Sequence, residues 1–349
     1  MKKIRLGIVG FGFMGHCDAD MMATFDEIDL VAVADTNPDQ LTDAPDGVET
    51  YGSMDEMLEK ADINVVMIST PNPSHLEMVE KAAAAGKDII CEKPAAMTVA
   101  QFDRMVEITE KAGVIFTVHQ QRRWDKDYRI MKEVYDRKLV GDMYVIKSQL
   151  YGVNGNMHDW HVFPEMGGGM LYDWGVHLID QILWMVDSEI DSLYADLRNV
   201  INEKVDDYFN ILIKFKNGIT AEIELGTYYL TPKRAWFIGG TKGSAIIDGF
   251  NGEGRIVRTA HLLENVPGRI TMTAAGPTRS FGPPEPGLLQ EEPLPEVHVD
   301  HRNYFEHFLK AFNGEEEIIV RPQQVRRVLA VMEAVRESAR CGEAIRFEK

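Results

Sequence analysis

A glycine-rich segment near the start of the chain constrains the fold more than any other feature. Its pattern G-x-G-x-x-G lies directly after an apolar run at 4–9 and opens a helical pattern. In such a strand–turn–helix unit, the glycines permit a tight turn, close approach of the backbone to a pyrophosphate, and close packing of helix on strand. The free amides of the helix N-terminus then bind the phosphates. The residues expected to contact a dinucleotide here are Gly10, Phe11, Gly12, Phe13, Met14 and Gly15.

An acidic residue follows the second apolar run at the position where a dinucleotide site needs one. Asp35 comes directly after the run at 29–34, twenty residues beyond Gly15. A carboxylate there accepts hydrogen bonds from the adenosine ribose and repels a 2′-phosphate. Thr36 and Asn37 follow, rather than arginine or lysine. We therefore expect NAD in preference to NADP; the alternative is a glycine turn without a ligand, with Asp35 as a surface residue.

The first 120 residues alternate between strand-like runs and helical patterns. Apolar runs lie at 4–9, 29–34, 63–69, 88–91 and 114–119. Between them, Ser53, Ser74 and Thr98 each precede a glutamate or glutamine by three residues, which is the pattern of a helix capping box. Alternation of this kind predicts a parallel sheet covered by helices. We therefore expect an α/β Rossmann domain with a parallel sheet over residues 1–122.

The pattern changes after residue 141. Runs at 143–151, 193–200, 208–216 and 219–228 favour strands, and one helix is expected at about 170–186. Asn217-Gly218 between two runs indicates a hairpin. Seven of the 15 prolines fall between 267 and 295, which predicts a long irregular loop, and helices near 300–312 and 322–340 close the chain. Because 349 residues exceed one ordinary core, a second, α+β domain is expected over 123–349.

Charge and cysteine content narrow the class of partner and compartment. The formal net charge is −18, which repels nucleic acid and anionic membranes unless a basic patch is concentrated locally. No apolar stretch approaches the roughly 18 residues of a membrane span. Cys17, Cys91 and Cys341 are too few, and odd in number, for a disulfide framework. We expect a cytoplasmic protein with no nucleic-acid or membrane partner.

Two clusters carry residues suited to proton transfer. Lys93 follows the fourth apolar run, at the sheet edge where open α/β sheets bind ligands. Asp173, His177 and Asp180 have the spacing i, i+4 and i+7, which places them on one face of a helix. A carboxylate fixes the orientation of an imidazole, which exchanges protons near neutral pH. The alternatives are a solvated lysine, a helix-capping aspartate and a satisfied core histidine.

Together these motifs resemble the Gfo/Idh/MocA family, the group of glucose–fructose oxidoreductase and inositol dehydrogenase. The resemblance rests on the glycine loop with Asp35, on Glu92-Lys93-Pro94, and on the run Gly167–Gly169 with Asp173 and His177. It implies a Rossmann domain followed by a domain with an open, mostly antiparallel sheet, which commonly forms homodimers or homotetramers. It further implies that Lys93 and His177 are catalytic, with Asp173 beside them.

The implied chemistry is hydride transfer between a carbinol C–H and C4 of a nicotinamide. We expect His177 to act as general acid/base, and Lys93 to hydrogen-bond the reacting oxygen and stabilise its developing charge. Asp173 would orient the substrate and tune His177. The expected substrate is a small carbohydrate or polyol: a sugar, a glycoside or an inositol-like molecule.

Polar and aromatic loops are expected to line the crevice around these groups. For His75, the alternative is an ordinary strand-to-helix turn. For Arg122 and Arg123, the alternative is a solvated turn in which they pair with Asp125 and Asp127. The residues expected near the cofactor are Thr70, Pro71, Asn72, His75, Glu92 and Lys93. Those expected near the substrate, besides the catalytic residues, are Gln121, Arg122, Arg123, Trp124, Tyr151, His158 and Trp160.

A metal site is not expected. His158 and His161 form H-x-x-H, but a site needs three or four converging ligands. Three functions remain open. The first is an NAD-dependent dehydrogenase acting on CH–OH groups. The second is a glycosidase-type enzyme that retains NAD and oxidises its sugar transiently, so that NADH does not accumulate. The third is a non-catalytic NAD-binding sensor, which has no chemical need for Lys93, Asp173 and His177 together.

Overall fold

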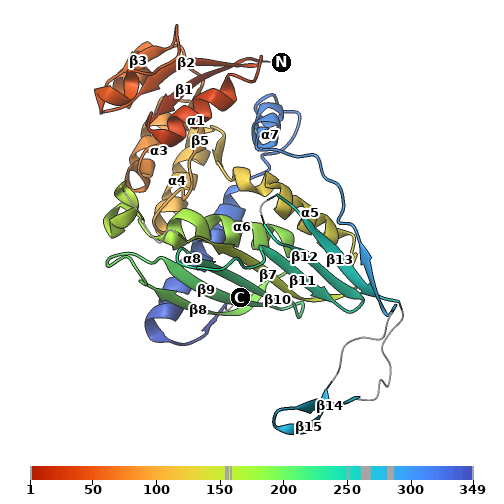
Figure 1. Cartoon of the computed structure of the whole chain (residues 1–349). Helices are drawn as coiled ribbons and strands as arrows, with labels where there is room; N and C mark the ends of the chain where they lie inside the picture. Colours follow the sequence, from red (N-terminus) through yellow and green to blue (C-terminus); the bar gives the residue numbers. More distant parts are fainter. Residues whose placement is uncertain are drawn as a thin grey trace.

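The computed structural model describes residues 2–153, 157, 159–249, 251–260, 269–280 and 287–347. Two large sheets organise these residues, one in the first third of the chain and one in the remainder (Figure 1). None of the helices in the described part combines the length and the apolar character needed to cross a membrane.

The first sheet is wholly parallel and has the order β3-β2-β1-β4-β5-β6. The strand order reverses between β1 and β4, and open α/β sheets bind ligands outside the carboxyl ends of the strands at such a point. The predicted parallel α/β domain is confirmed, with β3 as a strand that the sequence did not indicate. The strands are β1 Ile4–Val9, β2 Ile28–Ala34, β3 Glu49–Tyr51, β4 Val65–Ile68, β5 Asp88–Cys91 and β6 Phe116–Val118.

Two of the helices around this sheet begin where a side chain replaces a missing backbone hydrogen bond. Ser53 Oγ and Thr98 Oγ1 each accept from the amide three residues later at 3.2 Å, as predicted. The cap predicted at Ser74 is wrong, because a 3₁₀ turn precedes the helix and the Ser74 hydroxyl bonds the Pro71 carbonyl at 2.8 Å. The helices are α1 Phe13–Met22, α2 Met54–Lys60, α3 His75–Ala84 and α4 Val99–Ala112.

The second sheet is mixed, with the order β16-β13-β12-β11-β7-β10-β9-β8-β17. β7 and β10 pair in parallel and the other described pairs are antiparallel, which confirms a mostly antiparallel sheet. The predicted hairpin turn at Asn217-Gly218 joins β9 to β10. The strands are β7 Met143–Tyr151, β8 Ile190–Arg198, β9 Tyr208–Phe215, β10 Thr220–Gly226, β11 Trp236–Gly240, β12 Gly243–Ile247, β13 Gly254–Thr259, β16 Leu289–Glu292 and β17 Ile345–Arg346.

The segment 267–295, predicted as one irregular loop, contains strands and corrects that prediction. β14 Arg269–Thr273 and β15 Gly276–Ser280 form a two-stranded hairpin that projects from the body of the protein (Figure 1). Pro277 is tolerated there because each strand of a two-stranded sheet has an edge whose amides need no partner. β16 joins the end of the second sheet beside β13. Residues 281–286 lie outside the described residues.

Four more helices follow the first sheet along the chain. They are α5 Lys126–Asp136, α6 Val176–Met185, α7 Arg302–Phe312 and α8 Pro322–Cys341. α5, α6 and α8 lie over one face of the second sheet, whereas α7 lies beside the first (Figure 1). α8 contacts α4 and β6 as well as α6 and β8. We propose that the boundary at residue 122 separates the two sheets, and that α7 and α8 are shared between them.

Candidate functional site

The predicted dinucleotide loop follows β1, and two of its three glycines, Gly10 and Gly15, have a steric reason in the structure. Gly10 has φ 85°, and a Cβ there would lie 2.5 Å from the Ser69 carbonyl oxygen. A Cβ on Gly15 would lie 2.3 Å from the Gly10 carbonyl oxygen, so α1 could not pack against the loop. A Cβ on Gly12 would meet nothing within 4 Å. The open side of Gly12, at the start of α1, fits a loop whose amides bind a pyrophosphate.

Asp35 stands beside this loop, at the end of β2. Its Oδ2 accepts from the Phe11 amide at 2.8 Å, and its Oδ1 accepts from the Asn37 amide at 2.8 Å. These bonds fix the carboxylate against the glycine loop while each oxygen keeps a further lone pair. The Phe11 side chain is buried, whereas Phe13 is 82% exposed. Phe11 therefore belongs to the core and offers only its backbone to a ligand.

Lys93 and Asp173 come together from distant parts of the chain, as the sequence predicted only by resemblance. Lys93 follows β5, and its Nζ lies 2.9 Å from Asp173 Oδ1 and 2.9 Å from the Asp173 carbonyl oxygen. The side chains of Lys93 and Asp173 are 15% and 21% exposed. An ion pair this enclosed is screened less than one on the surface. The ammonium is therefore fixed at the carboxyl edge of the first sheet.

His177 lies at the start of α6 and is 2% exposed. Its Nδ1 lies 3.1 Å from Gln120 Oε1. Burial, and then the charges of Lys93 and Arg122, lower the pKa of His177 well below 6.5. The ring is therefore neutral at physiological pH, with Nδ1–H donating to Gln120 and the lone pair on Nε2. The orienting partner is thus an amide, whereas the sequence suggested a carboxylate.

A π-helical turn at Leu171–Gly175 precedes α6 and carries Asp173. The wider turn breaks the i, i+4 spacing, so Asp173 reaches Lys93 while His177 reaches Gln120. Asp206, which the sequence analysis missed, holds the start of this turn: its Oδ2 accepts from the Leu171 amide at 2.7 Å. A Cβ on Gly169 would lie 2.4 Å from Asp206 Oδ1, which explains part of the glycine run.

The loop after β4 separates into an exposed part and a buried support. Thr70 is partly buried and Pro71 is exposed, so both remain candidates for contact with a cofactor. Asn72 is buried, and its Nδ2 has no partner among the described residues. His75 corrects the prediction, because its side chain is fully buried. Its ring nitrogens lie 2.8 Å from the Thr70 carbonyl oxygen and 3.1 Å from that of Pro94, so His75 braces the loop from behind.

Two adjacent arginines in the 3₁₀ turn Gln121–Trp124 differ in burial. Arg122 is partly exposed, and its guanidinium lies 4.0 Å above the Trp174 ring. Asp125 Oδ2 accepts from Arg122 at 3.2 Å, and Asp125 Oδ1 lies 2.6 Å from His301 Nε2. His301, which the sequence analysis did not single out, thereby brings the start of α7 to this edge. Gln121 is buried, with its Oε1 unpaired among the described residues.

Arg123 and Trp124 were expected to line the substrate site, and the structure corrects both assignments. The Arg123 side chain has no exposed surface and makes two 2.7 Å bonds to Asp180. Its third nitrogen reaches the Ile319 carbonyl and Gln324 Oε1. Trp124 is 3% exposed and packs against Tyr304. Both residues tie α6 to the end of the chain, and neither presents a surface to a ligand.

The remaining predicted substrate residues lie after β7. Tyr151 ends β7 and Trp160 lies in a 3₁₀ turn, with the Trp160 ring stacked 3.8 Å from that of His161. Both side chains are partly buried, and their contact with a substrate stays a prediction. His158 lies outside the described residues, and so does the proposed H-x-x-H pairing.

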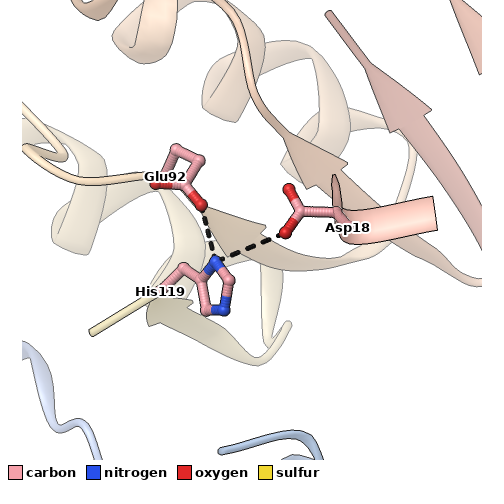
Figure 2. A group of neighbouring side chains, drawn as sticks. All are labelled: Asp18, Glu92 and His119. Carbon is pink, nitrogen blue, oxygen red and sulfur yellow. Dashed lines mark hydrogen bonds and ion pairs between the residues drawn. The ribbon is translucent and has the colours of Figure 1, made fainter. Parts of the chain in front are cut away.

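One group of described residues could in principle share a cation. Asp18 of α1, Glu92 after β5 and His119 after β6 place one ligand atom each within 4.8 Å of one another (Figure 2). All three are buried. Glu92 was expected near the cofactor, and the structure corrects this, because its two oxygens face His119 and the Lys93 amide. Burial raises the pKa of Asp18 to about 7, and the Glu92 and Asp18 carboxylates raise that of His119 despite its burial. No sequence motif indicates this cluster, because its members lie in three separate elements.

Comparison with known proteins identifies the family and the fold. The model of the oxidoreductase family with NAD-binding Rossmann fold matches residues 4–120, and that of the GFO/IDH/MocA C-terminal domain matches residues 128–246. The crystal structure of an NAD-binding protein from Listeria innocua has a TM-score of 0.93 and 34% identity, covering 99% of this chain and 100% of that chain.

Two curated relatives act on inositols. The myo-inositol 2-dehydrogenase of Thermotoga maritima is 27% identical over 63% of this chain and 68% of its own length. The scyllo-inositol 2-dehydrogenase (NADP(+)) IolW of Bacillus subtilis is 22% identical over 100% of this chain and 97% of its own. By its two family models and this structural likeness, the chain belongs to the Gfo/Idh/MocA family of oxidoreductases, with an NAD-binding Rossmann fold at its N-terminus.

Proposed function

We propose that this protein is an NAD-preferring dehydrogenase that oxidises a CH–OH group of a sugar, glycoside or inositol-like polyol. One observation carries the proposal: a buried, neutral His177 and a Lys93–Asp173 ion pair stand at the carboxyl edge of the dinucleotide-binding sheet. A base and a fixed cation at one edge are what removal of a hydroxyl proton requires.

The roles follow from the charges. His177 takes the hydroxyl proton on Nε2, because its ring is neutral and Nδ1–H is held by Gln120. Lys93 stabilises the negative charge that develops on the substrate oxygen. Asp173 holds the Lys93 ammonium in place, so that little reorganisation accompanies the reaction. A bound nicotinamide supplies the hydride acceptor.

The preference for NAD rests on Asp35. Its carboxylate is fixed against the glycine loop by two backbone amides, at the strand end where the adenosine ribose binds. A 2′-phosphate would meet this negative charge directly. The Bacillus subtilis relative is named for NADP(+), so the preference varies within the family and must be tested in this chain.

A polyol fits the outer wall of the site. Arg122 offers several guanidinium donors, and Trp174, which it covers, adds a flat apolar ring. Sugars and inositols present hydroxyls around an apolar ring face, so donors and aromatics together suit them. We assign Gln121, Tyr151 and Trp160 to the same wall as a proposal.

The test is turnover with a panel that includes myo-inositol, free aldoses and aryl glucosides, followed through the absorbance of NADH. His177→Ala and Lys93→Met should each lose about 100-fold or more of kcat while the NAD Kd is unchanged. Lys310→Met and His298→Ala, in exposed positions, serve as matched controls. Full turnover by either site variant would refute the assignment. Cleaved glycoside without NADH would instead identify the enzyme that retains its cofactor.

We further propose a homodimer or homotetramer formed through the uncovered face of the second sheet. Tyr144, Tyr194 and Leu212, on β7, β8 and β9, are 57%, 46% and 43% exposed. Large apolar side chains gathered on one sheet face favour burial against another subunit. Light scattering should find an oligomer for the wild type and a smaller species for Leu212→Glu; a monomeric wild type would refute the proposal.

A further inference from the structure

The buried cluster of Asp18, Glu92 and His119 stands directly behind the catalytic lysine. His119 Nδ1 lies 2.6 Å from Glu92 Oε1 and 3.7 Å from Asp18 Oδ1. Figure 2 shows both carboxylates directed at this one ring nitrogen. Ser69 Oγ, at the end of β4, donates to Asp18 Oδ2 at 3.1 Å. The cluster therefore ties α1, β4, β5 and β6 together beneath the crevice.

The closest contact in the cluster, between His119 and Glu92, is a hydrogen bond rather than a pair of metal ligands. Two ligands of one divalent ion, each at about 2.1 Å in tetrahedral or octahedral geometry, stand about 3 Å or more apart. The 2.6 Å between His119 Nδ1 and Glu92 Oε1 is shorter and matches a charge-assisted hydrogen bond. Glu92 is ionised, since His119 and Lys93 outweigh its burial and lower its pKa.

The second oxygen of Glu92 acts on Lys93 itself. Glu92 Oε2 accepts from the Lys93 backbone amide at 3.0 Å. Because Glu92 Oε1 is held by His119, the carboxylate cannot rotate away without breaking both bonds. The backbone of Lys93 is thereby fixed on one side, while Asp173 fixes its ammonium on the other.

We propose that Glu92 is a positioning residue for Lys93, held in its working orientation by His119. The inference rests on the proposed function, in which Lys93 contacts the reacting oxygen. It predicts that Glu92 and His119 control the rate of the hydride step and leave cofactor affinity unchanged. Displacing a catalytic group by about 1 Å costs about 100-fold in rate, so loss of this support should lower kcat by about 10- to 100-fold.

Two pairs of variants separate positioning from general stability. Glu92→Ala removes the acceptor for the Lys93 amide, whereas Glu92→Gln keeps an acceptor of the same length. His119→Phe keeps the ring that packs on Tyr304 and Phe305 but loses the donor. His119→Asn loses the ring but keeps a donor near the Nδ1 position. Positioning predicts low kcat in the alanine and phenylalanine variants and rescue in the glutamine and asparagine variants; a packing role predicts the reverse order for the two His119 variants.

A second readout does not depend on turnover. Hydrogen–deuterium exchange of the peptide around residue 93 should show a protected Lys93 amide in the wild type and Glu92→Gln, and fast exchange in Glu92→Ala. Thr109→Val, a buried polar change within α4, is the control for the stability of the same domain. The NAD Kd and the melting temperature are measured for every variant, with myo-inositol as the first substrate probe.

The outcomes are distinct. If Lys93→Met is inactive but Glu92→Ala and His119→Phe keep full kcat, the positioning role is refuted and the proposed function stands. If Lys93→Met is fully active, the proposed function itself fails. If the purified wild type carries one divalent cation per chain that Glu92→Ala lacks, the cluster is a metal site and the inference is overturned. Slow turnover with unchanged NAD Kd, rescued as described, supports it.

Discussion

Replacing Asp180 with asparagine tests whether Arg123 is structural. The Arg123 guanidinium is completely buried and bonds both carboxylate oxygens of Asp180 at 2.7 Å. Asparagine has the same shape, so Asp180→Asn creates no cavity. It removes the charge that compensates the guanidinium and exchanges one acceptor oxygen for an NH₂ group. The variant therefore measures the loss of the charge together with one hydrogen bond, at unchanged side-chain volume.

The magnitude follows from the burial of the pair. Removing one partner of a buried ion pair costs about 3–5 kcal/mol, because the other charge is left without compensation. Two acceptors remain for Arg123, the Ile319 carbonyl and Gln324 Oε1, which places the expected cost near the lower value, about 3 kcal/mol. For domains of this size, each kcal/mol lowers Tm by roughly 2–4 °C, so the expected loss is on the order of 10 °C.

The assay is thermal unfolding beside steady-state kinetics at 25 °C. We expect Asp180→Asn to lower Tm while the KM values for NAD and for the polyol stay within about twofold of the wild type. The double variant Arg123→Met/Asp180→Leu should be more stable than either single variant, since no charge is then buried alone. An unchanged Tm in Asp180→Asn, or a raised polyol KM at unchanged Tm in Arg123→Met, would refute the structural role.

Three further predictions use the site and its pKa values. Asp35→Asn should raise the ratio of NADP to NAD kcat/KM by about tenfold, the effect of removing about 1.4 kcal/mol of charge repulsion; an unchanged ratio would place the discrimination elsewhere. Because burial and neighbouring cations lower the pKa of His177, kcat/KM should fall only below pH 6.5; an acid limb above 6.5 would contradict a neutral buried ring. Burial raises the pKa of Asp127 from 3.8 to about 6, so the folded state keeps a proton that the unfolded state releases. The free energy of unfolding therefore falls as the pH rises from about 4 to 6. Asp127→Asn should remove this penalty of about 3 kcal/mol, raising Tm more at pH 7.5 than at pH 5; equal shifts at both pH values would count against it.

The dinucleotide half of the site was predictable because its signals are local. Gly10, Gly12 and Gly15 lie within six residues, and the steric reasons for Gly10 and Gly15 concern the loop itself and the neighbouring strand end. The place of Asp35 at the end of β2 follows from the same strand–turn–helix unit. Strand alternation likewise predicted five of the six strands of the first sheet, whereas the three-residue strand β3 is too short to produce a pattern.

Residues whose roles depend on distant partners were harder to assign. Arg122 and Arg123 are adjacent and chemically identical, so the sequence offers nothing to separate them. The 3₁₀ turn Gln121–Trp124 points one toward Trp174 at the crevice and the other toward Asp180 in the core. His75 illustrates the same limit: its position after β4 is correct, but its carbonyl partners lie behind the loop.

The helix that follows Asp173 shows most clearly where spacing fails as an argument. The interval i, i+4 between Asp173 and His177 implies one face only if the helix is regular, and the turn at Leu171–Gly175 is π-helical. The extra residue per turn lets Asp173 bond Lys93 while His177 turns to Gln120. A regular helix would favour a carboxylate–imidazole pair, which stabilises the protonated ring and raises its pKa. The irregular turn instead pairs the carboxylate with the lysine and the imidazole with an amide, so the pKa of His177 stays lowered.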